Sequence, residues 1–186
     1  MSVKIQTRAR LLLALAVLSI CGTCTLAHAQ TLEQVSARYA SLLEVKTGSQ
    51  QGIDDANDLA DDVLIYYTSV ADVFYVDEDL TEGDFYEGDW YLSDANSWLA
   101  TATVSLNRHN LPDDCMSAWD YMTNAAYYLN QAQVLIANNA PVAANAMLDA
   151  AESCYDQVEA VVSECNSELL YASDEIEYVE TDILGL

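Results

Sequence analysis

The strongest constraint on the fold is a helical pattern of apolar residues over 113–172, interrupted once by Asn138-Asn139-Ala140-Pro141. On both sides of the break, apolar residues recur at spacings of three and four, as on one buried helix face. They include Trp119, Met122, Ala126 and Leu129 before the break, and Met147, Ala151 and Val158 after it. Pro141 suits the first turn of a helix, where its missing N–H has no partner to lose. Because the connection is short, the pattern predicts an antiparallel pair of helices.

The rest of the chain shows the same helical periodicity. Gly48 and Gly52, with polar residues between them, are expected to end a first helix. The predicted helices are 31–47, 53–77, 89–108, 113–138 and 141–172, the last of which either bends near Ser173 or continues to about 183. The fold class predicted is therefore all-α, an up-and-down bundle of about five helices with a long C-terminal antiparallel helical hairpin.

Residues 1–29 read as a cleaved signal peptide. Lys4, Arg8 and Arg10 precede an apolar run over 11–20, and Ala27-His28-Ala29 matches a cleavage site. This apolar run is shorter than the roughly 20 residues that span a bilayer. Cleavage predicts a secreted or periplasmic protein in which residues 30–186 form a single acidic helical-bundle domain with no membrane span.

Two other interpretations of the leader use its cysteines. Leu18-Ser19-Ile20-Cys21 resembles a lipid-attachment motif, but Ile20 is bulky where a small residue is wanted. Cys21 and Cys24 have redox-type C-x-x-C spacing, but they lie in the part expected to be removed. We therefore expect simple cleavage of the leader.

Charge excludes several classes of partner. The whole chain has six Lys and Arg residues against thirty Asp and Glu, a formal charge of −24. Cleavage would leave only Arg38, Lys46 and Arg108 against the same thirty acids, a formal charge of −27. Such a surface repels nucleic acid and anionic membranes, and it permits basic partners, divalent cations or simply a salty habitat.

Residues 77–89 carry the densest cluster of possible ligands. The segment contains seven acids, two glycines and no base, and clustered carboxylates on a loop can bind calcium. The candidate metal ligands are Asp77, Asp79, Glu82, Asp84, Glu87 and Asp89. The match to an EF-hand loop is poor, because Glu82 stands where glycine is required and Gly88 where a bidentate glutamate is required. A solvated acidic loop is the simpler interpretation.

No catalytic constellation is visible. Beyond the leader there is one histidine, His109, beside Arg108 at a predicted helix end, where a cation is favourable for dipole reasons alone. The sequence has no zinc or haem spacing after residue 29. We therefore expect no enzyme activity, no catalytic residues and no cofactor, with calcium as the one alternative.

Three cysteines remain after the leader, and helix geometry limits their pairing. Cys154 and Cys165 are eleven residues apart on one predicted helix, about 16 Å, which exceeds the roughly 7 Å that a disulfide allows. Folding the hairpin at Ala140 places Cys115 opposite Cys165. The prediction is a Cys115–Cys165 disulfide and a free Cys154 thiol.

These observations predict an exported, non-catalytic helical-bundle protein that acts as a protein-interaction or structural module. Its partner is expected to be a protein, basic by charge complementarity, or a second copy of the chain. The alternative function is calcium binding through 77–89. The many tyrosines and tryptophans would suit a contact surface, since both are enriched at interfaces.

Overall fold

The computed structural model describes residues 31–107 and 116–186, which fold as helices joined by short turns. The α-helices are α2 (Leu32–Phe74), α3 (Glu82–Asn107), α4 (Ala118–Ala137) and α5 (Pro141–Tyr178). A π-helical turn, η1 (Val179–Ile183), extends α5. The described ranges contain no strand, which confirms the all-α class. They contain four α-helices rather than about five.

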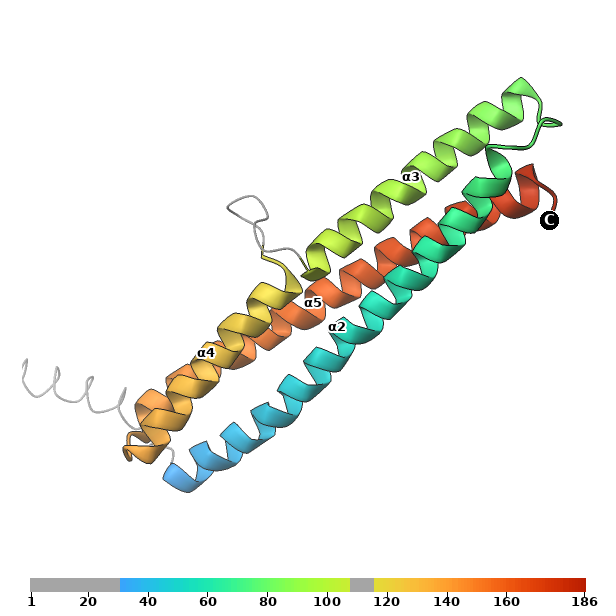
Figure 1. Cartoon of the computed structure of the whole chain (residues 1–186). Coiled ribbons are helices and arrows are strands. Elements are labelled where there is room, and N and C mark those ends of the chain that lie inside the picture. Colours follow the sequence, from blue (N-terminus) through green and yellow to red (C-terminus); the bar gives the residue numbers. More distant parts are fainter. Residues whose placement is uncertain (1–30, 108–115) are drawn as a thin grey trace, which may run out of the picture.

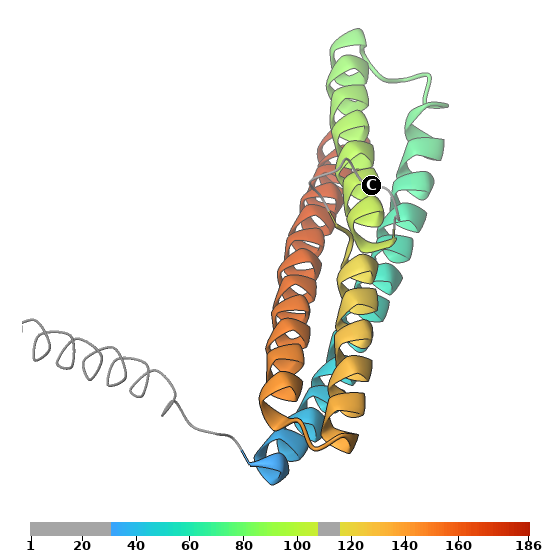
Figure 2. The ribbon, with the colours of Figure 1, turned by 90° about the vertical axis from the view of Figure 1, so that its left-hand side faces the viewer.

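The helices form three columns. The first column is α2, the second is α3 followed end to end by α4, and the third is α5 with η1 (Figures 1 and 2). The two long helices, α2 and α5, run in the same direction along the whole bundle. Helices α3 and α4, which lie between them in the sequence, run one after the other in the opposite direction. Helix α5 contacts every other helix of the described chain.

The columns pack through alternating large and small residues at heptad spacing, the pattern of a coiled coil. The buried residues of α5 follow steps of four and three, and those of α3 and α4 do the same. On α3 they are Gly88, Leu92, Ala95, Leu99, Ala102 and Leu106, and on α4 they are Ala118, Met122, Ala125, Leu129 and Ala132. Glycine or alanine at every second of these positions allows the helices to approach closely.

The buried residues form two cores, which follow one another along the length of the bundle. The α3-side core joins the C-terminal part of α2 to α3 and the C-terminal part of α5, and includes Phe74 and Leu169. The α4-side core joins the N-terminal parts of α2 and α5 to α4, and includes Val35 and Leu148. Val161 and Val162 pack against both cores. The junction therefore lies where α3 ends and α4 begins.

The predicted break at Gly48 and Gly52 is wrong, because α2 continues through both glycines. A capping box starts this helix, as predicted: Thr31 Oγ1 accepts from the Gln34 N–H, and Gln34 Oε1 accepts from the Thr31 N–H. Glycine costs about 1 kcal/mol within a helix. Packing of α2 against α5 on both sides of the glycines exceeds that cost.

The predicted acidic loop is also too long. Only the first part of 77–89 connects α2 to α3, since α3 begins at Glu82. Thr81 caps this helix: its Oγ1 accepts from the Asp84 N–H at 3.2 Å and donates to Asp84 Oδ2 at 2.6 Å. Gly88 is helical and buried, and its absent side chain leaves room for the ring of Phe74.

The region predicted as one long hairpin is divided. Helix α4 begins only at Ala118, so it covers the N-terminal half of α5, and α3 covers the rest. The buried face of α4 includes the predicted Met122 and Leu129, but Ala118 and Ala125 are buried in place of the predicted Trp119 and Ala126. Alanines line the contact, and the bulky Trp119 beside Ala118 remains 40% exposed. Helix α5 continues to Tyr178 and then into η1, which agrees with the longer of the two predicted ends.

Candidate functional site

The six candidate metal ligands do not converge. Within the described ranges, no three His, Cys, Asp or Glu side chains are grouped closely enough to hold a metal ion. Asp77 and Asp79 lie in the turn before α3, where the Asp79 N–H donates to Asp77 Oδ1 at 2.9 Å. Glu82 and Asp84 lie in the first turn of α3, and Asp84 caps it together with Thr81.

The last two candidate ligands accept hydrogen bonds from tyrosines on other helices. Tyr178 donates to Glu87 Oε1 at 3.0 Å, and Tyr75 donates to Asp89 Oδ1 at 2.8 Å. Glu87 and Asp89 therefore tie α3 to α5 and to the residue after α2. The structure does not bring the six carboxylates together, and calcium binding stays a prediction.

The cysteine prediction is tested only in part. Cys115, Arg108 and His109 lie outside the described residues, so the Cys115–Cys165 disulfide stays a prediction. Cys154 and Cys165 are free thiols in the structure. Cys165 is buried against α3, with Sγ 3.6 Å from the carbonyl oxygen of Ala102. Burial, followed by nearby carboxylates, raises the pKa of Cys165 to about 12. Its thiolate is therefore rare at neutral pH.

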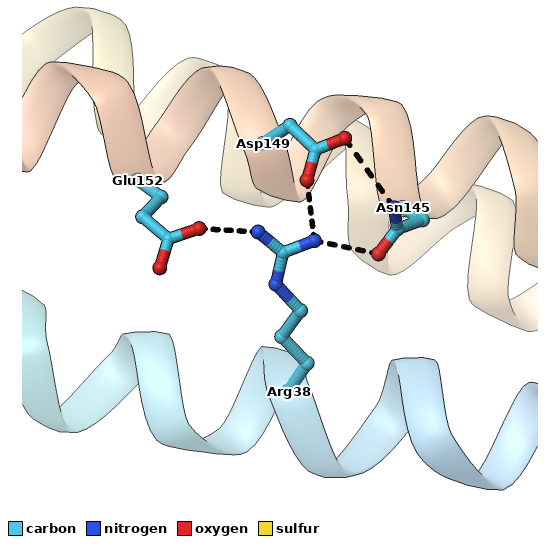
Figure 3. A network of polar contacts seen from close by, with 4 residues as sticks. All are labelled: Arg38, Asn145, Asp149 and Glu152. Carbon is cyan, nitrogen blue, oxygen red and sulfur yellow. Dashed lines mark hydrogen bonds and ion pairs between the residues drawn. The ribbon is translucent and has the colours of Figure 1, made fainter. Parts of the chain in front are cut away.

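One arginine makes the ion pairs seen in the described part of the chain. Arg38 of α2 donates from Nη1 to Asn145 Oδ1 at 2.6 Å and to Asp149 Oδ1 at 2.5 Å, and from Nη2 to Glu152 Oε2 (Figure 3). Asn145 also donates to Asp149 at 3.3 Å, so all three acceptors lie on one face of α5. This network joins the N-terminal parts of α2 and α5, and its arginine, amide and carboxylate groups pair with one another.

The seam between α3 and α5 presents a surface of a different kind. Three pairs of side chains follow one another along it, each with one residue from α3 and one from α5. They are Tyr91 with Tyr178, Asp94 with Glu175, and Trp98 with Tyr171, and we call them the aromatic–acid ladder. The ring centroids of the first pair are 4.4 Å apart and those of the last pair 6.1 Å.

The ladder therefore holds two carboxyl groups between two pairs of aromatic rings. Trp98 donates its indole N–H to Asp94 Oδ2 at 3.2 Å. Glu175 Oε2 is buried and has no hydrogen-bond partner among the described residues. Burial, and then the neighbouring carboxyl of Asp94, raise the pKa of Glu175. Two adjacent carboxyl groups with one unpartnered oxygen would be stabilised by a cation placed between them.

The rings that flank this pair remain accessible. Trp98 is 36% exposed and Tyr171 is 60% exposed. Next to the ladder, Trp90 packs edge-on against Tyr91 and is itself exposed. The faces of such rings attract cations, most strongly when the cation is a guanidinium group.

A second feature lies on the α2 side of α5. Residues of α2 and α5 around Gly48 line a groove of about 540 Å³. Among the residues that the structure describes, its lining comes from these two helices: Val45, Gly48, Ser49, Gly52, Tyr155, Asp156, Val158, Glu159, Val162, Ser163, Asn166, Ser167 and Leu170.

Neither feature was predicted from the sequence as a site. The ladder residues do lie at helical spacing, 91-94-98 on α3 and 171-175-178 on α5. That spacing could have shown that each set shares a helix face, but only the antiparallel pairing of α3 with α5 joins the two sets. The groove requires residues of α2 and of α5 to come together, which no local pattern encodes.

No helix in 31–107 or 116–186 combines the length and the apolar character needed to cross a membrane. Comparisons with protein-family models, with curated proteins and with solved structures find no match to this chain.

Proposed function

We propose that this protein is an exported, non-catalytic interaction module that binds a basic protein partner through the aromatic–acid ladder. The observation that carries the proposal is the contact between Asp94 and Glu175, enclosed by two aromatic pairs. An arginine or lysine side chain of a partner would pair with these carboxyl groups and stack on Trp98 or Tyr171. Tryptophan, tyrosine and arginine are also the residues that contribute most binding energy at interfaces.

The overall charge supports the same partner chemistry. A formal charge of −24 on the full chain attracts basic proteins over long distances and accelerates their association at low salt. Long-range attraction alone would be unspecific, because thirty acids are spread over the chain from Glu33 onward. The ladder supplies the local recognition that a specific complex requires.

The test compares two variants with the same change in charge. The first, Asp94→Asn with Glu175→Gln, neutralises the ladder, and the second, Asp58→Asn with Asp61→Asn, neutralises two exposed acids of α2. Each is titrated with hexa-arginine and with hexa-lysine peptides while tryptophan fluorescence is recorded. We expect tighter binding of hexa-arginine by the unmodified protein, and a loss of that preference in the ladder variant alone. Equal binding by both variants would show that net charge, and not the ladder, attracts the peptide.

The same variants can be used to recover the natural partner. Proteins retained by the unmodified chain and by the α2 variant, but not by the ladder variant, are the candidates. Retention should fall as salt is raised. If the ladder variant retains the same proteins as the α2 variant, the ladder does not form the interface.

Calcium binding by 77–89 is the alternative function. It would require the carboxylates of this segment to leave their tyrosine partners and to reorganise the first turns of α3. Trp90 adjoins the segment and would report such a change. Unchanged Trp emission and an unchanged melting temperature at millimolar calcium would exclude this alternative.

A further inference from the structure

The two carboxyl groups of the aromatic–acid ladder lie opposite each other across the seam between α3 and α5. The ring contacts at the two ends of the ladder fix how α3 is aligned with α5. On each helix the acid lies three residues from one ring and four from the other, so positions 91, 94 and 98 of α3 face positions 178, 175 and 171 of α5. Steps of three and four keep residues on one face of a helix. The alignment of the helices therefore brings Asp94 and Glu175 together.

Glu175 has an oxygen that a proton would satisfy. Its Oε2 atom is buried and has no hydrogen-bond partner among the described residues. Two donors of the ladder are already used, because Trp98 donates its indole N–H to Asp94 and Tyr178 donates its hydroxyl to Glu87. A carboxylate oxygen that is buried without a donor or a cation is costly. A protonated carboxyl group carries its own donor, and Asp94 lies beside it as the acceptor.

No base of the described residues lies near this pair. The bases in these ranges are Arg38 and Lys46, both in the N-terminal half of α2. Tyr66 of α2 donates to Glu180 at 2.5 Å, which places the level of Glu175 about five residues earlier on α2. Lys46 is another fifteen residues earlier, about 22 Å along the helix. A proton is therefore the positive charge at hand in the free protein.

The titratable groups that the structure describes around Glu175 are acids and tyrosines. Within four residues of its level they are Tyr91 and Asp94 on α3, Tyr171, Asp174, Glu177 and Tyr178 on α5, and Asp58, Asp61 and Asp62 on α2. At neutral pH such groups are negative or uncharged, so they favour retention of a proton by Glu175. Burial, and then the carboxyl group of Asp94, raise the pKa of Glu175 accordingly.

We propose that Asp94 and Glu175 share one proton in the free protein and release it when the cationic group of a basic partner binds the ladder. This inference rests on the proposed function and adds its regulation. The O–H bond of Glu175 breaks, the proton passes to the solvent, and the guanidinium or ammonium group stabilises the second carboxylate in its place. Because binding releases a proton, the partner binds more weakly as the pH falls. Acidification would therefore dissociate the complex.

Calorimetry of hexa-arginine binding to the full chain tests this exchange. Each titration is run in cacodylate and in MES, two buffers of different ionisation enthalpy, at intervals from pH 5 to pH 7. The difference between the two heats gives the number of protons released. We expect release of up to one proton per site in the unmodified protein and in Glu44→Gln, which neutralises an exposed acid of α2. The release should be lost in Glu175→Gln, which has no proton to give up.

The affinity should show the same linkage. From pH 5.5 to pH 7.5, ordinary glutamates, with pKa values of about 4.3, remain ionised. Over this range we expect the affinity of the unmodified protein for hexa-arginine to rise severalfold, and that of Glu175→Gln to change less than twofold. Titrations elsewhere, including those of the two histidines of the chain, are common to both proteins and cancel in the comparison.

Carbon-13 NMR of the glutamate carboxyl groups tests the unmodified protein directly. The signal that Glu175→Gln lacks belongs to Glu175. We expect it to titrate at higher pH than the other glutamates in the free protein, and at lower pH when hexa-arginine is saturating. An unchanged titration of this signal on binding would overturn the proposal.

The outcomes separate this inference from the proposed function. If the ladder prefers hexa-arginine to hexa-lysine but binding releases no proton, the ladder binds cations without the exchange, and only this inference is wrong. Equal proton release by the unmodified protein and Glu175→Gln would show that the proton comes from another group, with the same consequence. If the preference for hexa-arginine is itself absent, both proposals are wrong.

Discussion

The same substitution, glycine to alanine, should have opposite effects on stability at two helical positions. At Gly48 the new methyl group meets no atom within 4 Å. The change then acts through backbone entropy and helix propensity alone, which favour alanine by about 0.5–1 kcal/mol within a helix. For a chain of this length, the melting temperature should rise by about 1–4 °C.

At Gly88 the new methyl group meets the ring of Phe74. The Cβ atom would lie 2.7 Å from Cζ of Phe74 and closer still to Cε2. Phe74 is fully buried, and its ring stacks on Phe85 with centroids 5.3 Å apart, so it cannot rotate away freely. Overpacking of this kind costs about 1–3 kcal/mol, and the gain in propensity offsets part of it. We expect a net loss on the order of 1–2 kcal/mol.

Urea unfolding of the full chain, followed by circular dichroism at 222 nm, measures both effects. The mechanism at Gly88 is checked by a double-mutant cycle with Phe74→Leu, since a smaller residue at 74 should reduce the cost of Gly88→Ala. Destabilisation by Gly48→Ala would show that the space at Gly48 is not open in solution. An unchanged cost of Gly88→Ala in the Phe74→Leu background would show that the ring is not the obstacle.

Three further predictions concern charge and thiol chemistry. Arg38→Met should destabilise the fold by about 1–2 kcal/mol, because it leaves three polar acceptors of α5 without their shared donor. The control Lys46→Met, at an exposed position, should change stability by less than about 0.5 kcal/mol. Equal effects of the two substitutions in urea unfolding would argue against the Arg38 network. Because the pKa of Glu175 is raised, the folded state binds the proton of this carboxyl group more tightly than the unfolded state does. The contribution of Glu175 to the free energy of unfolding should therefore fall as the pH rises from the ordinary glutamate pKa through the raised pKa. Glu175→Gln should therefore stabilise the protein at pH 7 and reduce the pH dependence of unfolding above pH 4.5, and an unaltered pH profile would contradict this. Non-reducing peptide mapping should find Cys115 joined to Cys165, and labelling of both residues as thiols after unfolding without reductant would disprove the bond.

Local patterns in the sequence were sufficient to predict helices and a bundle, but not their ends. Periodicity located every helix of the described ranges at least in part, and the Thr31 capping box placed the start of α2 correctly. Gly48 and Gly52 were misinterpreted because glycine usually ends a helix, and only packing of α2 against α5 shows that here it does not. At α3, Thr81 and Asp84 already formed a capping signal in the sequence, but the acidic composition around them favoured a loop.

The candidate sites were beyond sequence reasoning for a different reason. The ladder requires Asp94 and Glu175, eighty-one residues apart, to meet across α3 and α5. The register of that pairing follows from the packing of two cores and not from either segment alone. The groove near Gly48 is lined by residues of both α2 and α5, and neither helix shows it in its own sequence pattern.

The position of α5 after α2, α3 and α4 in the chain has a consequence for folding during synthesis. Neither core is complete without this helix, since α5 contributes to both. While α2, α3 and α4 emerge from the ribosome, their apolar stripes lack the partner that buries them. Domains usually fold as units once their residues are available, and for these two cores that requires α5 to have emerged. The nascent chain should therefore remain unfolded and sensitive to protease until α5 has emerged, and mutual repulsion among its acidic residues would limit aggregation over that interval.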